Sequence, residues 1–505
     1  MTTYQDLKDF FQNQNLKVII AADAETRVSQ RKNGDIISKI AAGGVSIALD
    51  PIARAAGALY ISRGKTEDEK KIASEKGNKI IIEDQNGNYT LKRLFFSQEE
   101  INSYYYGFSN QILWPLCHVA FEKPEFNREW LDGFRSVNQK FAQAIKEEVK
   151  EKSFIWINDY QLCLVPHYLE KPKDSVVGFF WHIPWPTWEI FRILPFKQEI
   201  LESLLQCDFI AFHRGYHARN FLETVEREVE AKIDEERDMV YFNKHAVTVK
   251  NLPLGIDADV IHSLIHVEQK ETFLTRTVKS LLHFDRTNGT LDEFFDKHAV
   301  IIGVDRLDYT KGLILRLYAI ERFFQKYPKF IGKVSYLGII APSREAIPSY
   351  GSLHKQVRTV SEQINVKFAK DNWKPINITY EVFPRKDIVN FYRKSQLCLV
   401  TPRDDGMNLV SKEFVIASSY SKNPGMLVLS RFAGSAIDLT QALIVNPYDI
   451  EEVADAIKKG LTMSKKEKKD RIQAMAETLE ERNIYEWGKE FVRSALSAAK
   501  ESKKL

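Results

Sequence analysis

Two cations stand between a strand-like run and a helix-like run in one short segment of the sequence. Residues 303–317 read GVDRLDYTKGLILRL and contain Arg306 and Lys311. Two fixed cations beside the positive end of a helix suit a pyrophosphate. On spacing alone, the alternative is that both are ordinary surface cations.

A second segment, residues 400–414, reads VTPRDDGMNLVSKEF and has an acidic pair and a glycine between a buried strand and a helix. Backbone N–H groups at the start of that helix can face a ligand. Asp405 could accept hydrogen bonds from sugar hydroxyls, and Glu413 from a ribose diol. The alternative is a capped helix start, in which the Asp and Asn side chains serve only the backbone.

Three further groups indicate less by themselves. His182 follows an apolar run and precedes two prolines that stiffen the turn, although a lone histidine is more often structural. The glycine pair at 43–44 lets a backbone approach a ligand before a helix, or simply forms a tight loop. Tyr105, Trp114 and Asp159 join aromatic rings to a carboxylate, as in a sugar platform, although aromatics at helical spacing are more often core residues.

Short hydrophobic runs precede most of these candidates and predict the strands that position them. Their near-continuous hydrophobicity is typical of strands covered on both faces. Helical patterns alternate with them, for example at 98–108, 204–212 and 411–419. We therefore expect an α/β architecture with parallel sheets, in which ligands bind beyond the carboxyl ends of the strands. The predicted strands are residues 17–22, 153–158, 176–182, 209–213, 299–304, 333–340, 376–381, 397–402 and 425–430.

The length and composition predict two large globular domains. The chain has 505 residues, of which 44% are hydrophobic, and the strand–helix pattern breaks near 251–261 before a new series begins at Ala299. The 72 basic and 68 acidic side chains give a net charge of +4. That balance is too even to indicate a nucleic acid or an anionic membrane as a partner.

The cysteines and the N-terminus indicate a cytoplasmic protein. Four widely separated cysteines lie in apolar runs, which predicts reduced core residues. The N-terminus lacks the features of a signal peptide, and the densest apolar stretch, residues 176–185, is far shorter than the ~20 residues of a membrane span. We expect neither export nor membrane insertion. The cysteines are Cys117, Cys163, Cys207 and Cys398.

Taken in order, the motifs resemble glycosyltransferase family 20, whose best-known members are trehalose-6-phosphate synthases. The resemblance runs from about Gly43 to Asp449. It implies the GT-B fold, with two Rossmann-like domains whose parallel sheets face each other across a cleft. We expect an acceptor domain at 1–250, a donor domain at 251–481, and a C-terminal helix at about 482–505 that packs back on the first domain. The motifs are YYYGFSNQILWPLCH, WINDYQL, GFFWHIPWP, LPLGID, GVDRLDYTKGL, APSRE, DDGMNLVSKEF and SRFAGSAIDLTQALIVNPYD.

The resemblance implies a retaining transfer of glucose from a nucleotide-glucose (UDP-, ADP- or GDP-glucose) to glucose 6-phosphate, giving trehalose 6-phosphate. No metal and no cofactor are expected, and the leaving phosphate itself accepts the acceptor's proton. The implied donor residues are Arg306 and Lys311 for the pyrophosphate; Asp405 with Gly406, Met407, Asn408, Leu409 and Val410 for the glucose and distal phosphate; Glu413 for the ribose; His182 beside the reacting carbon; and Gly44 in the closing loop.

On the acceptor side, the resemblance implies Tyr105, Trp114 and Asp159 around the sugar and Arg344 on its phosphate. The sequence also departs from the family here. The first strand usually ends in Ser-Asn-Arg, with the arginine on the acceptor phosphate, but this chain reads IIAADAETRVSQR. Either Arg27 or Arg31 could take that role. Arg63, also expected at the acceptor, replaces a usual tryptophan, and Asn158 and Gln161 stand where histidines are common.

These departures leave the acceptor open. The alternatives are a relative that glucosylates another phosphorylated polyol such as glycerol 3-phosphate, a pseudo-glycosyltransferase that couples cyclitols, and a non-catalytic homologue that binds sugar phosphate. Retention of the whole donor set argues against the last. We expect a separate phosphatase to act on the product. The sequence leaves open the donor base and whether the protein forms a homo-oligomer.

Overall fold

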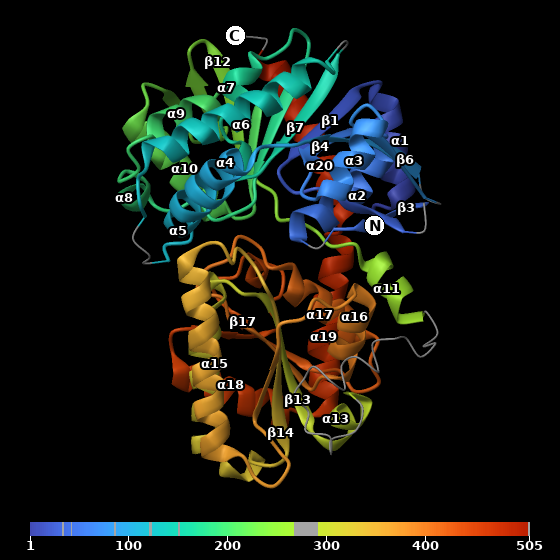
Figure 1. The fold of residues 1–505 in the computed structure, drawn as a ribbon, viewed down its shortest axis with the longest axis vertical. Helices are drawn as coiled ribbons and strands as arrows, with labels where there is room; N and C mark the ends of the chain where they lie inside the picture. Colours follow the sequence, from blue (N-terminus) through green and yellow to red (C-terminus); the bar gives the residue numbers. More distant parts are fainter. Residues whose placement is uncertain are drawn as a thin grey trace. The chain divides into compact units, whose positions relative to one another are not determined.

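The computed structural model describes residues 1–32, 35–41, 43–84, 87–120, 124–149, 152–266 and 291–502. The chain divides into two compact units (Figure 1). The first, called unit 1, comprises Met1–Gly255 and Arg482–Leu505, and the second, unit 2, comprises Ile256–Glu481.

Unit 1 is built on a ten-stranded sheet in the order β10-β11-β12-β9-β8-β7-β1-β4-β6-β5. Neighbouring strands from β12 to β6 pair in parallel, and antiparallel pairs flank them at both edges. A separate antiparallel hairpin joins β2 and β3. The strands are β1 Lys17–Ala22, β2 Arg27–Lys32, β3 Asp35–Ile40, β4 Leu59–Arg63, β5 Lys79–Asp84, β6 Gly87–Leu94, β7 Ser153–Asn158, β8 Val176–Trp181, β9 Phe209–Phe212, β10 Lys232–Asp234, β11 Met239–Phe242 and β12 His245–Asn251.

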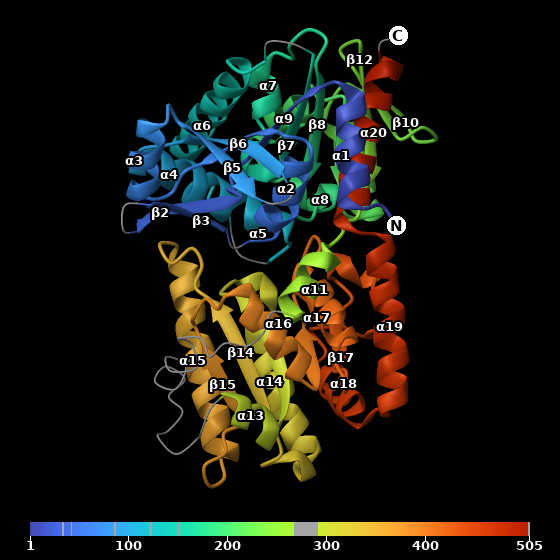
Figure 2. The same cartoon turned by 90° about the vertical axis from the view of Figure 1, so that its right-hand side faces the viewer.

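The C-terminal helix belongs to unit 1. Helix α20 (Ile484–Ser502) lies alongside α1 (Tyr4–Gln14), as Figure 2 shows. The Phe491 ring stacks on Trp156 of β7 at 4.2 Å between centroids. Aromatic burial therefore fixes this helix on the sheet. The other helices are α2 Gly44–Ala55, α3 Glu67–Glu75, α4 Gln98–Ile101, α5 Trp114–Cys117, α6 Arg128–Lys146, α7 Val165–Leu169, α8 Trp188–Phe191, α9 Lys197–Leu204 and α10 Gly215–Glu228, with a π-helical segment at Asn102–Leu113.

Unit 2 has a six-stranded parallel sheet in the order β15-β14-β13-β16-β17-β18. Helix α14 packs against α15 and α18, and α17 packs against α11, α16 and α19. The elements are α11 Ala258–His266, α13 Leu291–Lys297, β13 Ala299–Arg306, α14 Leu313–Lys326, β14 Val334–Ala341, α15 Pro348–Phe368, β15 Ile376–Thr379, α16 Arg385–Lys394, β16 Leu397–Val400, α17 Leu409–Ser419, β17 Met426–Ser430, β18 Leu443–Val445, α18 Ile450–Thr462 and α19 Lys465–Glu481.

The α/β architecture with parallel sheets confirms the sequence-based prediction. The runs 17–22 and 153–158 coincide with β1 and β7, and the other predicted strands begin or end within two residues of the observed ones. The helix expected over 204–212 is wrong: α9 ends at Leu204 and Phe209–Phe212 form β9. That short run is apolar throughout because β9 is buried between β8 and β12, and periodicity does not separate such a strand from a buried helix.

The four cysteines are buried free thiols, as expected from their apolar surroundings. In the described part of the chain, the helices are all too short or too polar to cross a membrane.

Candidate functional site

Three neighbouring strands of unit 2 end at one edge of the sheet and carry residues predicted for the donor and for the acceptor phosphate. β13 pairs in parallel with β14 on one side and β16 on the other. Arg306 is the last residue of β13, Arg344 follows β14, and Asp405 follows β16. The edge of a parallel sheet beyond the carboxyl ends is where α/β proteins bind ligands. The structure thus brings residues from three separate motifs together.

Lys311 and Asp405 form an ion pair at this edge. The Lys311 Nζ lies 2.6 Å from Asp405 Oδ2, and Asn408 Nδ2 donates to the same oxygen at 3.1 Å. Gly312, at φ +65°, follows Lys311 directly, and a Cβ there would lie 2.4 Å from the carbonyl oxygen of Thr401. The glycine therefore allows the close approach that holds Lys311 and Asp405 together.

Asp308 links the cations of the site. Its Oδ2 accepts from Arg344 Nη1 at 3.2 Å, and its Oδ1 accepts from the backbone N–H and the hydroxyl of Thr310. Burial by itself would raise the pKa of Asp308, but the charges of Arg344, Arg306 and Lys311 outweigh it and lower the pKa. The carboxylate is therefore ionised. The sequence analysis missed this residue, although an acid between two cations in DRLDYTK was a signal for it.

Arg344 is buried in an unusual backbone conformation. Its φ is +51°, and its Nη1 donates to the Tyr350 hydroxyl at 2.6 Å. The Tyr350 hydroxyl also lies 3.4 Å from Asp308 Oδ2. A left-handed conformation at a non-glycine residue costs energy and persists where the surrounding contacts fix it. The Arg344 guanidinium is therefore held in place from two sides.

The loop after β16 was predicted either to face a ligand with its backbone or to cap the following helix. Asn408 caps α17, since its Oδ1 accepts from the Ser411 N–H at 3.0 Å, and it also donates to Asp405. A second loop clamps residues 405–407: Gly434 N donates to Asp405 O at 2.9 Å and Ser435 N donates to Met407 O at 2.7 Å. The backbone of Gly406, Met407, Leu409 and Val410 is thus fixed at the start of the helix.

Glu413 lies one turn into α17 and is buried. Arg385, the first residue of α16, donates to its Oε1 through Nε at 3.0 Å and Nη2 at 2.8 Å. A carboxylate held by an arginine fork keeps one orientation. Arg385 is a second residue that the sequence analysis missed, because nothing local relates it to a glutamate 28 positions away.

In unit 1, the neighbouring strands β8, β7, β1 and β4 lead into His182, predicted beside the donor sugar, and into Asp159 and Arg63, predicted at the acceptor. His182 follows β8, Asp159 follows β7, and Arg63 ends β4. These positions again share the carboxyl edge of a parallel sheet.

His182 is buried and neutral. Its Nε2 lies 3.1 Å from Asn158 Oδ1. The Asn158 Nδ2 donates to the carbonyls of Ala21 and Trp156, so its Oδ1 is the acceptor and the Nε2 of His182 carries the hydrogen. Burial lowers the His182 pKa to about 3. The imidazole can therefore hydrogen-bond but is a poor proton acceptor near neutrality.

Asp159 and Trp114 both contact neighbouring residues of unit 1. Asp159, at φ +73°, accepts through Oδ1 from the N–H groups of Tyr160 at 3.0 Å and His182 at 3.2 Å. Its carboxylate therefore ties two strand ends together. Trp114 is buried, with its ring 4.0 Å from that of His118. Trp114 thus contributes to the core of unit 1, which is the more common role of an aromatic at helical spacing.

The three arginines of unit 1 that were expected at the acceptor are each paired with a carboxylate. Arg63 binds Asp23, Arg27 binds Asp50 at 2.9 Å, and Arg31, exposed on the hairpin, binds Glu75. Tyr105 is half-buried beneath Arg63. The glycine pair stands at the start of α2: Gly44 is the first residue of the helix, whereas Gly43, at φ +142°, holds the conformation that requires glycine.

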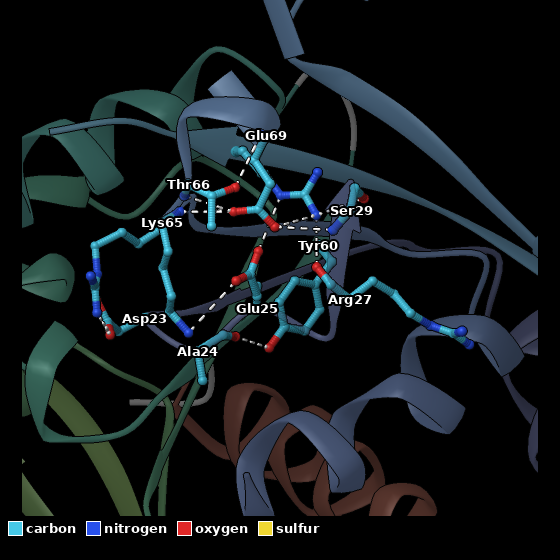
Figure 3. A network of polar contacts seen from close by, with 11 residues as sticks. Asp23, Ala24, Glu25, Arg27, Ser29, Tyr60, Lys65, Thr66 and Glu69 are labelled. Carbon is cyan, nitrogen blue, oxygen red and sulfur yellow. Dashed lines mark hydrogen bonds and ion pairs between the residues drawn. The ribbon is translucent and has the colours of Figure 1, made fainter. Parts of the chain in front are cut away.

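A buried polar cluster lies beside Asp23, as Figure 3 shows. Glu25 Oε2 accepts from Arg93 Nε at 3.2 Å, and the Lys65 Nζ lies 3.6 Å from Glu25 Oε1. Glu69 accepts from the Ser29 N–H at 3.1 Å and so ties the hairpin to α3. Burial, together with the charge of Glu69, raises the pKa of Glu25 to about 7.

Comparisons with known proteins agree with this geometry. Residues 15–497 match the model of glycosyltransferase family 20. The chain belongs to glycosyltransferase family 20. Its fold is therefore GT-B and it is a glycosyltransferase, as the motifs implied.

Three similar proteins illustrate the relationship. The chain is 31% identical over 97% of its length to "Alpha,alpha-trehalose-phosphate synthase [UDP-forming] A" of Dictyostelium discoideum, and it spans 63% of that protein. A solved structure of "Trehalose-6-phosphate from E. coli bound with UDP-2-fluoro glucose" matches with a TM-score of 0.79 at 30% identity, over 95% of this chain and 98% of the other. An alpha,alpha-trehalose-phosphate synthase from Burkholderia xenovorans in complex with glucose-6-phosphate matches with a TM-score of 0.81 at 28% identity, over 95% of this chain and 100% of the other.

Proposed function

We propose that the protein transfers glucose from UDP-glucose to glucose 6-phosphate with retention of configuration and so makes trehalose 6-phosphate. The observation that carries the proposal is the set of Arg306, Lys311 and Asp405 at one edge of the unit 2 sheet, beside the start of α17. The choice of uridine diphosphate rests on the relatives, which are named as UDP-forming or bound with a UDP-glucose analogue.

On the donor side, the leaving group is a nucleoside diphosphate whose negative charge grows as the glycosidic bond breaks. Arg306 and Lys311 are suited to stabilise that charge, together with the N–H groups at the start of α17. Asp405 is suited to hold the hydroxyls of the transferred glucose, because Lys311 and Asn408 fix its carboxylate. Glu413, oriented by Arg385, would bind the ribose.

We further propose that the reaction uses no metal ion and no side-chain base. The two cations and the helix start take the place that a divalent ion holds in other diphosphate sites. The departing phosphate oxygen then accepts the proton of the acceptor hydroxyl. The neutral, weakly basic imidazole of His182 fits a hydrogen-bonding role toward the donor sugar better than that of a base.

On the acceptor side, Arg344 is the proposed phosphate ligand. Its guanidinium is held by Asp308 and Tyr350, so it is ordered before a ligand arrives. The Burkholderia xenovorans relative, solved with glucose-6-phosphate, supports this acceptor class.

A second candidate acceptor is glycerol 3-phosphate. The observation that favours it is the Asp23–Arg63 pair, which stands where the family usually has other residues.

The buried free thiols support a place in the cytoplasm. A homo-oligomer and a separate phosphatase for the product stay predictions.

A matrix of donors and acceptors tests the proposal. UDP-, ADP- and GDP-glucose are each incubated with glucose 6-phosphate, glycerol 3-phosphate or free glucose, and the product is identified by mass and by the anomeric coupling in its NMR spectrum. We expect the UDP-glucose and glucose 6-phosphate pair to be preferred, with an α,α-linked product. Preference for glycerol 3-phosphate would make glycerol 3-phosphate the acceptor. If none of the three donors is consumed, the proposed glucosyl transfer is wrong.

A further inference from the structure

Asp23 and Arg63 form a buried ion pair at the ends of two adjacent strands. Arg63 Nε lies 2.7 Å from Asp23 Oδ1, and Nη2 lies 2.8 Å from Oδ2. The two residues are only 5% and 7% exposed. β1 and β4 pair in parallel, which places the residue after β1 beside the last residue of β4. Figure 3 shows Asp23 at this strand end, next to Glu25 and Lys65.

The pair holds two consecutive tyrosines. The Tyr104 hydroxyl donates to Asp23 Oδ1 at 3.0 Å, and the guanidinium carbon of Arg63 lies 4.5 Å from the centre of the Tyr105 ring. Both tyrosines belong to the π-helical segment Asn102–Leu113. Such segments are rare and occur frequently at functional sites, where they present side chains at angles that an α-helix does not allow.

The two tyrosines differ in what they can do. Tyr104 is fully buried and stacks on Phe134 at 5.6 Å, so it anchors the segment. Tyr105 is half-buried and is one of the two aromatic residues that the family resemblance implies around the acceptor sugar. The Arg63 guanidinium lies over its ring and restricts the orientation of the side chain.

The geometry argues against Arg63 as a phosphate ligand. Arg63 forms a fork–fork contact through Nε and Nη2 with both oxygens of Asp23, whereas Arg344 contacts Asp308 through Nη1 at 3.2 Å. An acceptor phosphate at the bidentate face of Arg63 would therefore have to displace a buried carboxylate. Burial alone would raise the pKa of Asp23, but Arg63 lowers it, which keeps both members charged. The cation is therefore balanced within the protein.

We propose that the Asp23–Arg63 pair is a positioning element for the acceptor: it fixes Tyr105 against the sugar or polyol ring and does not itself bind the acceptor phosphate. This inference rests on the proposed function. It assigns a role to two positions at which the sequence departs from its family, and it predicts that the pair tunes the affinity for the carbon skeleton of the acceptor.

The test compares three variants. Arg63→Met removes the guanidinium but keeps the length of the side chain. Arg63→Lys keeps a charge for Asp23 but loses the planar fork over the ring. The double variant Asp23→Asn/Arg63→Met removes both charges and leaves an oxygen to accept from Tyr104. Replacing both members of a buried pair avoids the unpaired charge that a single change leaves, so the double variant is expected to fold.

The readout is kcat/KM for glucose 6-phosphate and for free glucose, with the KM for UDP-glucose. For Arg63→Met and the double variant we expect kcat/KM to fall about 10-fold for both acceptors, with an unchanged donor KM and partial recovery in Arg63→Lys. A fall for glucose 6-phosphate alone would show direct phosphate binding and overturn the proposal. Unchanged kinetics in folded protein, with or without a lower Tm, would overturn it too.

Arg135→Met is the matched control, because Arg135 on α6 makes the same fork contact with Glu199, at 2.8 Å from Nε and 2.6 Å from Nη2. Its kinetics should equal those of the wild type. If the wild type uses glycerol 3-phosphate instead, the proposed acceptor is wrong. The kcat/KM values of the variants are then compared for glycerol 3-phosphate and for glycerol.

A readout independent of turnover uses protein labelled with 3-fluorotyrosine. The Tyr105 resonance is assigned with Tyr105→Phe. Loss of Arg63 should shift and broaden it, and an unchanged resonance would overturn the proposal even in a protein that transfers nothing.

Discussion

Gly434 offers a direct test of how the donor loop, residues 405–410 after β16, is positioned. A Cβ at this residue would lie 1.9 Å from the carbonyl oxygen of Gly406, 2.6 Å from its carbonyl carbon and 2.8 Å from the Cα of Met407. An ordinary van der Waals contact begins at 3.4 Å, so the Gly406 backbone would have to move by about 1.5 Å. No flexible side chain is available to absorb that movement, because the contacting atoms are backbone.

The expected cost follows from this displacement. A misplacement of about 1 Å in a positioned group costs on the order of 100-fold in rate, or about 2.7 kcal/mol in the barrier. Overpacking should also lower the free energy of unfolding by roughly 1–3 kcal/mol. For Gly434→Ala we therefore expect kcat/KM for UDP-glucose to fall about 100-fold in protein that still folds, with a lower Tm.

The assay is steady-state kinetics against UDP-glucose, with circular dichroism and thermal melting of the same samples. Gly351→Ala is the matched control, because a Cβ there meets no atom within 4 Å and the residue lies within α15. It should leave the kinetics unchanged and raise stability by up to about 1 kcal/mol. A folded Gly434→Ala protein with wild-type kinetics would refute the claim that the 432–435 loop positions the donor loop.

Three further predictions concern charge. Arg306→Ala and Lys311→Ala should each lower turnover by about 10-fold to 150-fold, since a charge-assisted contact is worth roughly 1.5–3 kcal/mol, and folded variants with unchanged kinetics would remove both residues from the site. Activity should survive EDTA, because the two cations and the start of α17 act on the diphosphate; loss with EDTA and recovery with magnesium or manganese would contradict this. The Glu25 pKa is raised to about 7 from 4.5, so the folded state binds more protons than the unfolded state between these two pH values. The contribution of Glu25 to the free energy of unfolding is therefore present below pH 4.5 and is lost as the pH rises through about 7. Glu25→Gln should therefore flatten the fall in unfolding free energy across pH 4.5–7, measured by urea denaturation, and an unchanged slope would argue that Glu25 titrates normally.

The sequence by itself determined the strands and the donor motifs. Runs such as 17–22 and 397–402 are short and almost continuously apolar, which is typical of parallel strands covered on both faces. Arg306 ends β13, and Lys311 and Asp405 lie in the segments that follow β13 and β16. Their placement at strand ends was predictable because it depends on local pattern alone. The α/β architecture followed from the same pattern.

Only the tertiary structure decided which polar groups become partners. Arg63 was expected to add a positive charge for the acceptor, but the pairing of β1 with β4 sets it against Asp23, 40 positions away. The contacts of Arg385 with Glu413 and of Gly434 with Gly406 likewise join segments that are far apart in the sequence. Hydrophobic periodicity is a local property that fixes each element. The pairing of buried charges depends on strand order and on the ångström-scale approach of distant loops, and no local pattern encodes either.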